Sequence, residues 1–212
     1  MRSRLQVWHV FDTQLAQLLP AVHRARLHVL ALLTVGMLLA ETVVLPRIAA
    51  ALPLGVRRAS LEKRFARFLA NPAVDAHELW AGLLPALLAD RAGTPIELVF
   101  DPTPQNGTFT VLVLGLIEHS RVLPVAWAVV PQQTRWTESQ IAILTRLCTT
   151  VAAALPAGCR VTLLADRGIT SPAVIALCRS LGWAFVLRLS VSATQTNRVR
   201  GGRDQSRWCG TW

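Results

Sequence analysis

The chain has 212 residues, 52% of them hydrophobic, and a formal net charge of +10. This hydrophobic content is high enough to form a core, which excludes the class of chains that are too polar to fold. The length allows one large domain or two small ones. The charge favours a polyanionic partner, nucleic acid first and an anionic membrane second, with +5 in residues 1–94, +1 in 95–187 and +4 in 188–212.

The first 94 residues are expected to be helical throughout. Apolar spacing predicts a short helix, a long helix, and two more helices, over residues 12–19, 23–44, 57–72 and 75–91. Ser60 is the expected N-cap of the third helix, and Asp75 with Glu78 forms a capping-box-like start for the fourth, which Gly93 ends.

One apolar segment in this region raises a membrane alternative. LHVLALLTVGMLLA, residues 27–40, has 14 residues before Glu41, whereas a spanning helix needs about 20. We therefore interpret it as a buried helix of a helical region, with membrane insertion as the less favoured reading.

The third predicted helix carries a run of basic side chains opposed only by Glu62. A solvated helix face is one interpretation, and contact with the DNA backbone is the other, because one sign of charge dominates. The residues are Arg57, Arg58, Lys63, Arg64 and Arg67.

The pattern changes at Thr94-Pro95, where short apolar runs and turn signals begin. Asn106-Gly107 predicts a tight reversal between two strands. Thr137 with Gln140, and Ser171 with Pro172, predict the starts of two helices. The expected order is strand, strand, strand, helix, strand, helix, strand, over residues 96–101, 108–117, 122–130, 137–156, 161–166, 171–181 and 183–190.

This order predicts an α/β (α+β) fold, with a helical N-terminal region followed by a partial ribonuclease-H-like mixed sheet with flanking helices. If the fourth strand pairs in parallel with the first, Asp101 and Asp166 end at the same edge. Two adjacent carboxylates repel each other unless a divalent cation such as Mg²⁺ lies between them. The alternative is that Asp101 starts a turn and Asp166 pairs with Arg167.

Cysteine usage is the last signal that composition offers. The four cysteines are spread too widely for a CxxC pair, so we interpret them as small core residues in a reducing cytoplasm, with a zinc site as the alternative. They are Cys148, Cys159, Cys178 and Cys209.

Two long stretches carry a resemblance to a known family. LVFDPTPQNGTFTVLVLGLIEHSRVLPVAW and LPAGCRVTLLADRGITSPAVIALCRSLGWAFVLRL resemble the first half of the catalytic domain of DDE transposases of the insertion-sequence-four type. The resemblance spans about residues 27 to 190 and includes the upstream SLEKRFARFLANPAVD. By position it implies that Asp101 and Asp166 are the first two catalytic acids and metal ligands, with Arg167 and Gly168 in the motif around the second.

The same resemblance implies cut-and-paste DNA transposition with Mg²⁺ or Mn²⁺ as cofactor, in which Asp101 bridges two ions and Asp166 binds one. The family's third acid is a glutamate in a Tyr-Arg-Glu-Lys signature, but this chain has no tyrosine and no glutamate after Glu138. We therefore expect a truncated, catalytically inactive transposase: a helical region (1–94), a partial catalytic domain (95–190) and a basic, disordered tail (191–212).

The alternative function is a DNA-binding or dominant-negative regulatory remnant that pairs with intact transposase. The expected partners are DNA (transposon ends and target), together with a second copy or an intact transposase, and not a membrane. Arg57, Arg58, Lys63, Arg64, Arg67 and Arg167 are the candidate DNA-binding residues. The expected location is the bacterial cytoplasm, in association with the nucleoid.

Overall fold

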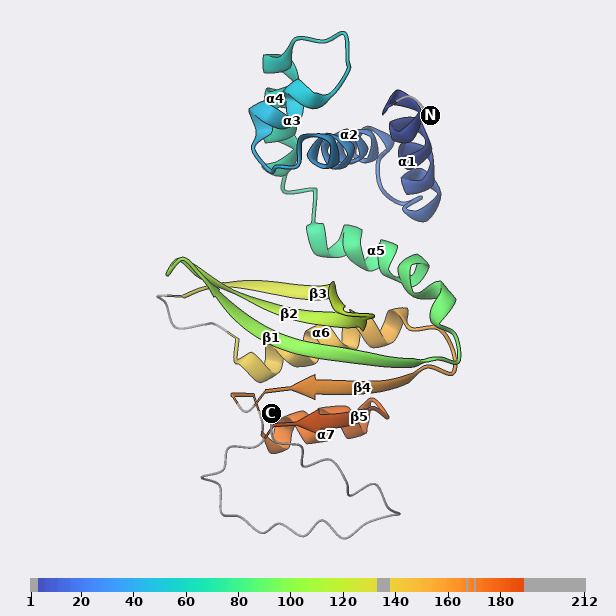
Figure 1. Ribbon diagram of the computed structural model, residues 1–212, viewed down its shortest axis with the longest axis vertical. Coiled ribbons are helices and arrows are strands. Elements are labelled where there is room, and N and C mark those ends of the chain that lie inside the picture. Colours follow the sequence, from blue (N-terminus) through green and yellow to red (C-terminus); the bar gives the residue numbers. More distant parts are fainter. Residues whose placement is uncertain (1–3, 133–137, 167, 170, 189–212) are drawn as a thin grey trace.

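A computed structural model describes residues 4–132, 138–166, 168–169 and 171–188, and contains helices followed by a mixed five-stranded sheet (Figure 1). The elements in chain order are α1 (Arg4–Leu18), α2 (Arg24–Ala40), α3 (Leu45–Ala51), α4 (Arg58–Leu69), α5 (Ala76–Leu88), the 3-10 turn η1 (Ala89–Arg91), β1 (Pro95–Gln105), β2 (Phe109–Glu118), β3 (Arg121–Pro131), α6 (Gln140–Ala154), β4 (Arg160–Ala165), α7 (Pro172–Ser180) and β5 (Ala184–Leu187).

The strand order β3-β2-β1-β4-β5 confirms the predicted α/β fold class. β1, β2 and β3 are antiparallel neighbours, whereas β4 pairs in parallel with β1 and β5 pairs in parallel with β4. This is the arrangement of a ribonuclease-H-like sheet, and it follows from two hairpins and then two helical crossovers in the same direction.

Two of the predicted helix starts are confirmed. The Asp75 carboxylate accepts hydrogen bonds from the backbone N–H groups of His77 (2.7 Å) and Glu78 (3.0 Å), so α5 begins as expected. At α7, the Ser171 hydroxyl caps the helix and Pro172 occupies the first turn.

The other two starts differ from the prediction. Ser60 lies inside α4, because the N-cap is Arg57, three residues before the predicted cap, and no side chain caps the helix. The N-cap of α6 is Ser139, which accepts a bond from the N–H of Ala142 at 3.1 Å, and the expected cap Thr137 lies outside the described residues.

The predicted helix over 23–44 is also wrong in its extent. α2 stops at Ala40 because Glu41 adopts a left-handed conformation (φ 49°), and a separate helix, α3, begins at Leu45 with Pro46 in its first turn. None of the described helices is long and apolar enough to cross a membrane by itself. α2 and α3 reach the necessary length and hydrophobicity only when they are taken together, and they are bent by 89° relative to each other.

β1 runs past the predicted strand end at Asp101 to Gln105. Beyond Phe100 it has lost its β4 neighbour and pairs only with β2, so it is an edge strand where Pro102 and Pro104 are tolerated. The predicted reversal at Asn106-Gly107 is confirmed, since both residues have positive φ (49° and 70°).

Helices cover one face of the sheet. Alternate strand residues such as Leu98, Phe100 and Leu163 are buried with side chains of α6 and α7, and these two helices lie behind the sheet in Figure 1. The opposite face carries no helix over β1, β4 and β5 in the part of the chain that the structure describes (Figure 1).

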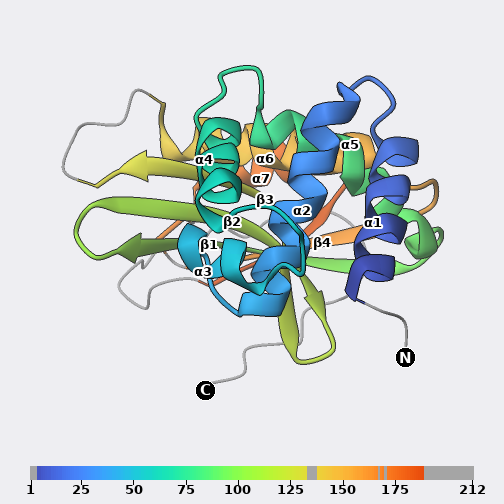
Figure 2. The same cartoon turned by 90° about the horizontal axis from the view of Figure 1, so that it is seen from above.

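α5 connects the sheet to the other helices. Leu84 and Leu88 belong to the core of the sheet, whereas Leu79 and Leu83 pack against a small core between α1 and α2. A separate core joins α2, α3 and α4, and these helices lie on the far side of α5 from the sheet (Figures 1 and 2).

Candidate metal and nucleic-acid sites

The register of β1 and β4 brings the two predicted acids together. Phe100 pairs with Ala165 in the parallel ladder, so Asp101 and Asp166 are the next residues on neighbouring strands, which lie about 4.8 Å apart in a sheet. Because Phe100 and Ala165 are buried in the core, the alternation of side chains directs both aspartates to the face opposite α6 and α7. Both are exposed there.

Asp101 lies within β1 and does not start a turn, which argues against the structural alternative for this residue. Its Oδ2 accepts a hydrogen bond from the Thr103 hydroxyl at 2.8 Å. Thr103 is two positions along the same strand, so it lies on the same face and orients the carboxylate. Thr103 was not predicted as a site residue, although the Asp-x-Thr spacing in an extended strand is the signal for such a bond.

Asp166 follows the last residue of β4 and faces the side chain of Arg188, which follows the last residue of β5. Arg188 Nη1 lies 3.6 Å from Asp166 Oδ1, and the Arg188 backbone N–H donates to the Ala165 oxygen at 3.1 Å. Arg167, the expected partner of Asp166, lies outside the described residues. Arg188 is therefore a site residue that the sequence analysis missed, because its position depends on the β4–β5 register.

Three charged residues thus form one row across three parallel strands. Phe100, Ala165 and Leu187 are paired across β1, β4 and β5, and the residue after each of them is charged. The row on the open face reads Asp101, Asp166, Arg188.

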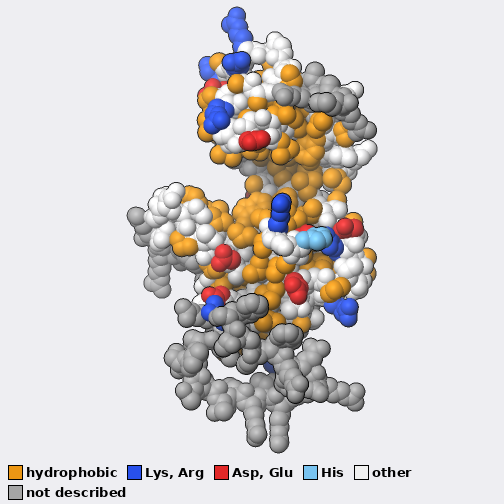
Figure 3. All heavy atoms as spheres, viewed as in Figure 1, with side chains coloured by type: hydrophobic (Ala, Val, Ile, Leu, Met, Phe, Trp, Pro, Cys, Tyr) orange, Lys and Arg blue, Asp and Glu red, His pale blue; other side chains and the backbone are white. Residues whose placement is uncertain are grey.

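Apolar side chains occupy the middle of the same face. Val129 and Val186 are 57% and 58% exposed, and Val99, Val113 and Leu164 are half-buried between them. Figure 3 shows hydrophobic side chains across this face, with acidic and basic groups scattered among them. The carboxylate pair therefore lies beside a wide apolar surface.

The side chains of the row supply only some of the oxygen ligands that a hard divalent cation needs. Mg²⁺ is commonly held by one or two carboxylates together with substrate phosphates and water, and Asp101 and Asp166 supply two such carboxylates. No three His, Cys, Asp or Glu side chains gather into a group that could hold a metal ion within the described ranges. Among the described residues the pair supplies two ligands for a cation, and water or a substrate phosphate would supply the others.

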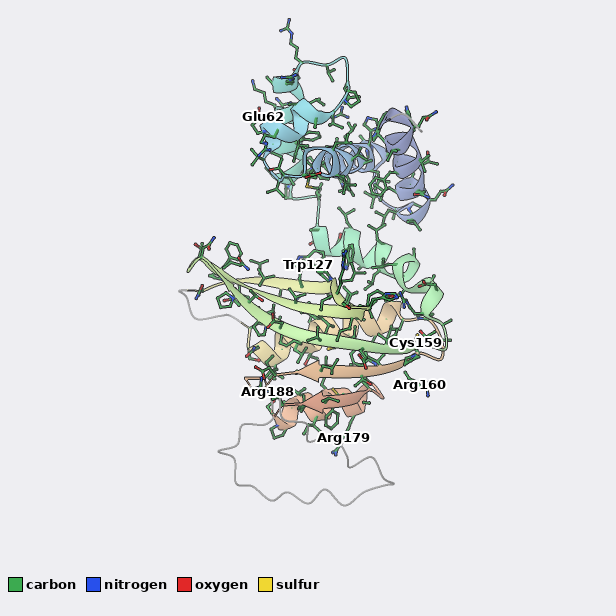
Figure 4. The ribbon with its side chains drawn as sticks, in the orientation of Figure 1. Glu62, Trp127, Cys159, Arg160, Arg179 and Arg188 are labelled. Carbon is green, nitrogen blue, oxygen red and sulfur yellow. The ribbon has the colours of Figure 1, made fainter. Side chains whose placement is uncertain are left out.

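The predicted basic residues lie on the outer face of α4. Leu61, Phe65 and Phe68 are buried on the inner face, and Glu62 is half-buried (Figure 4). The five basic residues are all exposed, and none forms an ion pair within the part of the chain that the structure describes; they are Arg57, Arg58, Lys63, Arg64 and Arg67.

The basic face and the carboxylate row are on separate parts of the molecule. α4 lies beyond α5, whereas Asp101 and Asp166 lie on the sheet (Figure 1). The structure therefore does not combine them into one site.

The chain matches no known family model and no curated protein.

Proposed function

We propose that this chain is a DNA-binding member of the DDE transposase type, of the insertion-sequence-four kind, that carries the first two of the three metal-binding acids. The observation that supports this most is the register of β1 and β4, which sets Asp101 beside Asp166 at the end of neighbouring parallel strands. That juxtaposition is the one that the sequence resemblance requires.

In this proposal Asp101 and Asp166 hold Mg²⁺ or Mn²⁺. When bound, the ions would activate the attacking oxygen and stabilise the leaving oxygen in phosphodiester cleavage. Thr103 fixes one oxygen of Asp101, so that the carboxylate is oriented before a cation arrives.

Two acids are insufficient for the complete reaction. The only acid after Asp166 is Asp204, which lies in a stretch with no helical pattern. We therefore propose that the 212-residue chain binds DNA without cutting it. Nicking by the purified chain that disappears in Asp166→Ala would contradict this part of the proposal.

A direct test is Mn²⁺ binding, followed by electron paramagnetic resonance of the free ion. Asp101→Asn and Asp166→Asn should each abolish binding at the pair, because each removes one of the two anionic ligands. Glu97→Gln is the matched control, since Glu97 is an exposed acid on the same face of β1, four residues before Asp101. Equal binding by all four proteins would refute the metal-binding pair.

A regulatory DNA-binding protein is the second candidate function, and the exposed basic face of α4 favours it. Such a protein would occupy element ends, or pair with an intact transposase and inhibit it. Leu61 and Phe65 point inward and the arginines are exposed, so their positive charges are accessible to phosphate groups.

DNA binding can be tested by its salt dependence. Arg64→Gln with Arg67→Gln should weaken binding at low salt and lower the slope of log K against log salt by about 2, because each substitution removes one charge that neutralises a phosphate. Arg160→Gln, an exposed arginine at the start of β4 (Figure 4), is the control and should leave the slope unchanged. A flat salt response in the unmodified chain would exclude binding through phosphates.

A further inference from the structure

The ladder between β1 and β4 ends at the pair of Phe100 and Ala165, although β1 itself continues well beyond it (Figure 1). In a parallel ladder, a bonded residue accepts from one of the two residues that flank its partner and donates to the other. Arg160 shows the pattern: its partner is Pro95, and its N–H donates to the oxygen of the preceding residue, Thr94, at 3.2 Å. The Arg160 oxygen therefore faces the residue after Pro95, and the pattern repeats at every second residue of β4.

Asp166 falls on the same repeat, because it lies an even number of residues after Arg160. A ladder pair between Asp166 and Asp101 would require the Asp166 oxygen to accept from the N–H of residue 102, and Pro102 has none. That oxygen instead accepts from the Ile169 N–H at 3.0 Å, and the Ile169 side chain is buried in the core of the sheet. The chain thus leaves β4 at the residue where the ladder lacks a donor.

We propose that Pro102 is a positioning residue, which ends the β1–β4 ladder and leaves the Asp166 oxygen to Ile169, so that the chain turns out of the sheet. Pro102 in this way fixes Asp166 as the last residue that lies beside β1. The inference goes beyond the proposed function, because it concerns the backbone and holds whether or not a cation or DNA binds near the two aspartates.

Pro104 provides a comparison on the same strand. It lies two residues after Pro102, so its nitrogen faces the same edge of β1 and also lacks a hydrogen. At both positions β1 pairs with β2 and with no other described strand. The two prolines differ in what lies opposite, because the register places the Asp166 oxygen beside position 102 and no described residue of β4 beside position 104. Only a donor at position 102 could therefore extend the ladder.

The experiment is amide hydrogen exchange of the full chain and its variants, followed by NMR. In Pro102→Thr, the new N–H at position 102 should bond to the Asp166 oxygen and exchange about fivefold more slowly than an unprotected amide, as expected for one ladder bond. The Ile169 N–H should lose protection by a similar factor, because it loses that acceptor. Pro102→Ala should give the same two results, since it restores the same donor with a residue of low strand propensity.

Pro104→Thr is the matched control, because it adds an N–H to the same edge where β4 no longer lies opposite. This N–H should exchange at close to the unprotected rate, and the exchange of Ile169 should not change. Protection at position 102 that increases with protein concentration would come from pairing between two copies, and it would overturn the assignment to Asp166.

Two further outcomes would overturn the proposal. If the N–H at position 102 exchanges as fast as the N–H at position 104, the ladder ends without help from the proline. If position 102 is protected while Ile169 is unchanged, the turn after Asp166 does not depend on the missing donor. Circular dichroism shows whether each variant is folded, and Pro102→Ala gives the comparison if Pro102→Thr is not. The exchange is measured without metal ions, so its result is independent of the proposed metal site.

Discussion

The indole Nε1 of Trp80 on α5 donates a hydrogen bond to the backbone oxygen of Val125 on β3, at 2.6 Å. β3 is one of the two edge strands of the sheet, and edge strands expose unpaired backbone groups that can pair with other chains. Trp80 therefore satisfies one such group and attaches α5 to the sheet. The ring of Trp127, 5.5 Å from that of Trp80, packs beside it on β3.

Trp80→Phe should lower the free energy of unfolding by about 1–2 kcal/mol, because the Val125 oxygen loses its partner and the smaller ring packs less well. Urea unfolding followed by circular dichroism measures the change. Trp127→Phe is the control, since it shrinks the neighbouring ring and keeps the Trp80 bond (Figure 4). Equal losses in the two variants would assign the effect to packing rather than to the bond.

Gly36 permits the close approach of α2 and α3. A Cβ at this position would lie 2.6 Å from Ile48 Cγ2 and 3.2 Å from Leu52 Cδ1, closer than van der Waals contact allows. Gly36→Ala should therefore destabilise the helical region by about 1–3 kcal/mol, despite the better helix propensity of alanine. Gly55→Ala is the control, because a Cβ there meets no atom within 4 Å, and thermal unfolding compares the two. A stabilised Gly36→Ala variant would contradict the packing argument.

The sequence was sufficient to predict the sheet because its signals are local. Asn106-Gly107 specifies the first hairpin, and the Ser171-Pro172 start specifies the second crossover helix. Those elements, with the handedness of crossovers, leave few topologies open, and Asp101 and Asp166 then become neighbours. Once this topology is predicted, the aspartates at the ends of the first and fourth predicted strands are enough to predict the candidate pair.

The remaining features depend on contacts between distant residues. Arg188 joins the row through the β4–β5 register, which no local pattern encodes. The break between α2 and α3 depends on Glu41 adopting a left-handed conformation, which is uncommon for glutamate and is favoured by packing of Ile48 against α2. Such tertiary effects override the continuous apolar pattern that predicted one long helix.

The start of α5 should make stability depend on acid pH. Hydrogen bonds from the backbone N–H groups of Glu78 and His77 lower the pKa of Asp75 below its ordinary value of 3.8. A carboxyl group with a lowered pKa in the folded state stabilises the fold above the ordinary value, and this contribution is lost as pH falls below 3.8 towards the folded pKa. Stability should therefore decline over that window.

Asp75→Asn separates this cap from the other carboxylates. Asparagine also accepts bonds from the helix N–H groups but does not titrate, so the variant should lose less stability than the unmodified chain between pH 4 and pH 2, a window of about two units that starts near the ordinary aspartate pKa and runs below it. Thermal unfolding at each pH gives the comparison. Parallel pH profiles for the two proteins would show that Asp75 contributes nothing to the acid dependence.

The buried thiols of α6 and α7 should behave differently from Cys159. Burial raises the pKa of Cys148 to about 12, with a smaller contribution from nearby Cys178, and burial also raises the pKa of Cys178. A thiol that stays neutral and inaccessible reacts poorly, because the thiolate is the nucleophile. Cys159 is only half-buried, near the end of the sheet, with its Sγ 3.1 Å from the Arg91 oxygen (Figure 4).

Iodoacetamide at about pH 8 should therefore alkylate Cys159 well before Cys148 or Cys178, because the two thiols in the core are inaccessible. Peptide mass spectrometry with and without denaturant measures the order, and denaturant should remove the difference. Equal rates at Cys148 and Cys159 in the folded chain would mean that α6 opens on the timescale of labelling, contrary to its position in the core.

The same burial predicts a loss of stability at alkaline pH. In the unfolded chain Cys148 ionises near its ordinary value of 9.0, but in the folded chain it stays protonated to about 12. Stability is therefore complete below pH 9 and falls between pH 9 and 12, by up to about 1.4 kcal/mol per pH unit for one proton. The chain has no tyrosine, which removes the usual competing titration in this range.

Cys148→Ala gives the matched comparison. The variant loses some packing at every pH, but its unfolding free energy should depend less on pH between 9 and 12, because the buried thiol no longer titrates. Urea unfolding at pH 8, 9, 10 and 11, spaced over about three units around the ordinary cysteine pKa, measures the two slopes. If the unfolding free energy of the variant has the same pH slope as that of the unmodified chain, Cys148 ionises as readily in the folded state as in the unfolded state. The packing of Cys148 between α6 and the sheet would then be looser than in the structure.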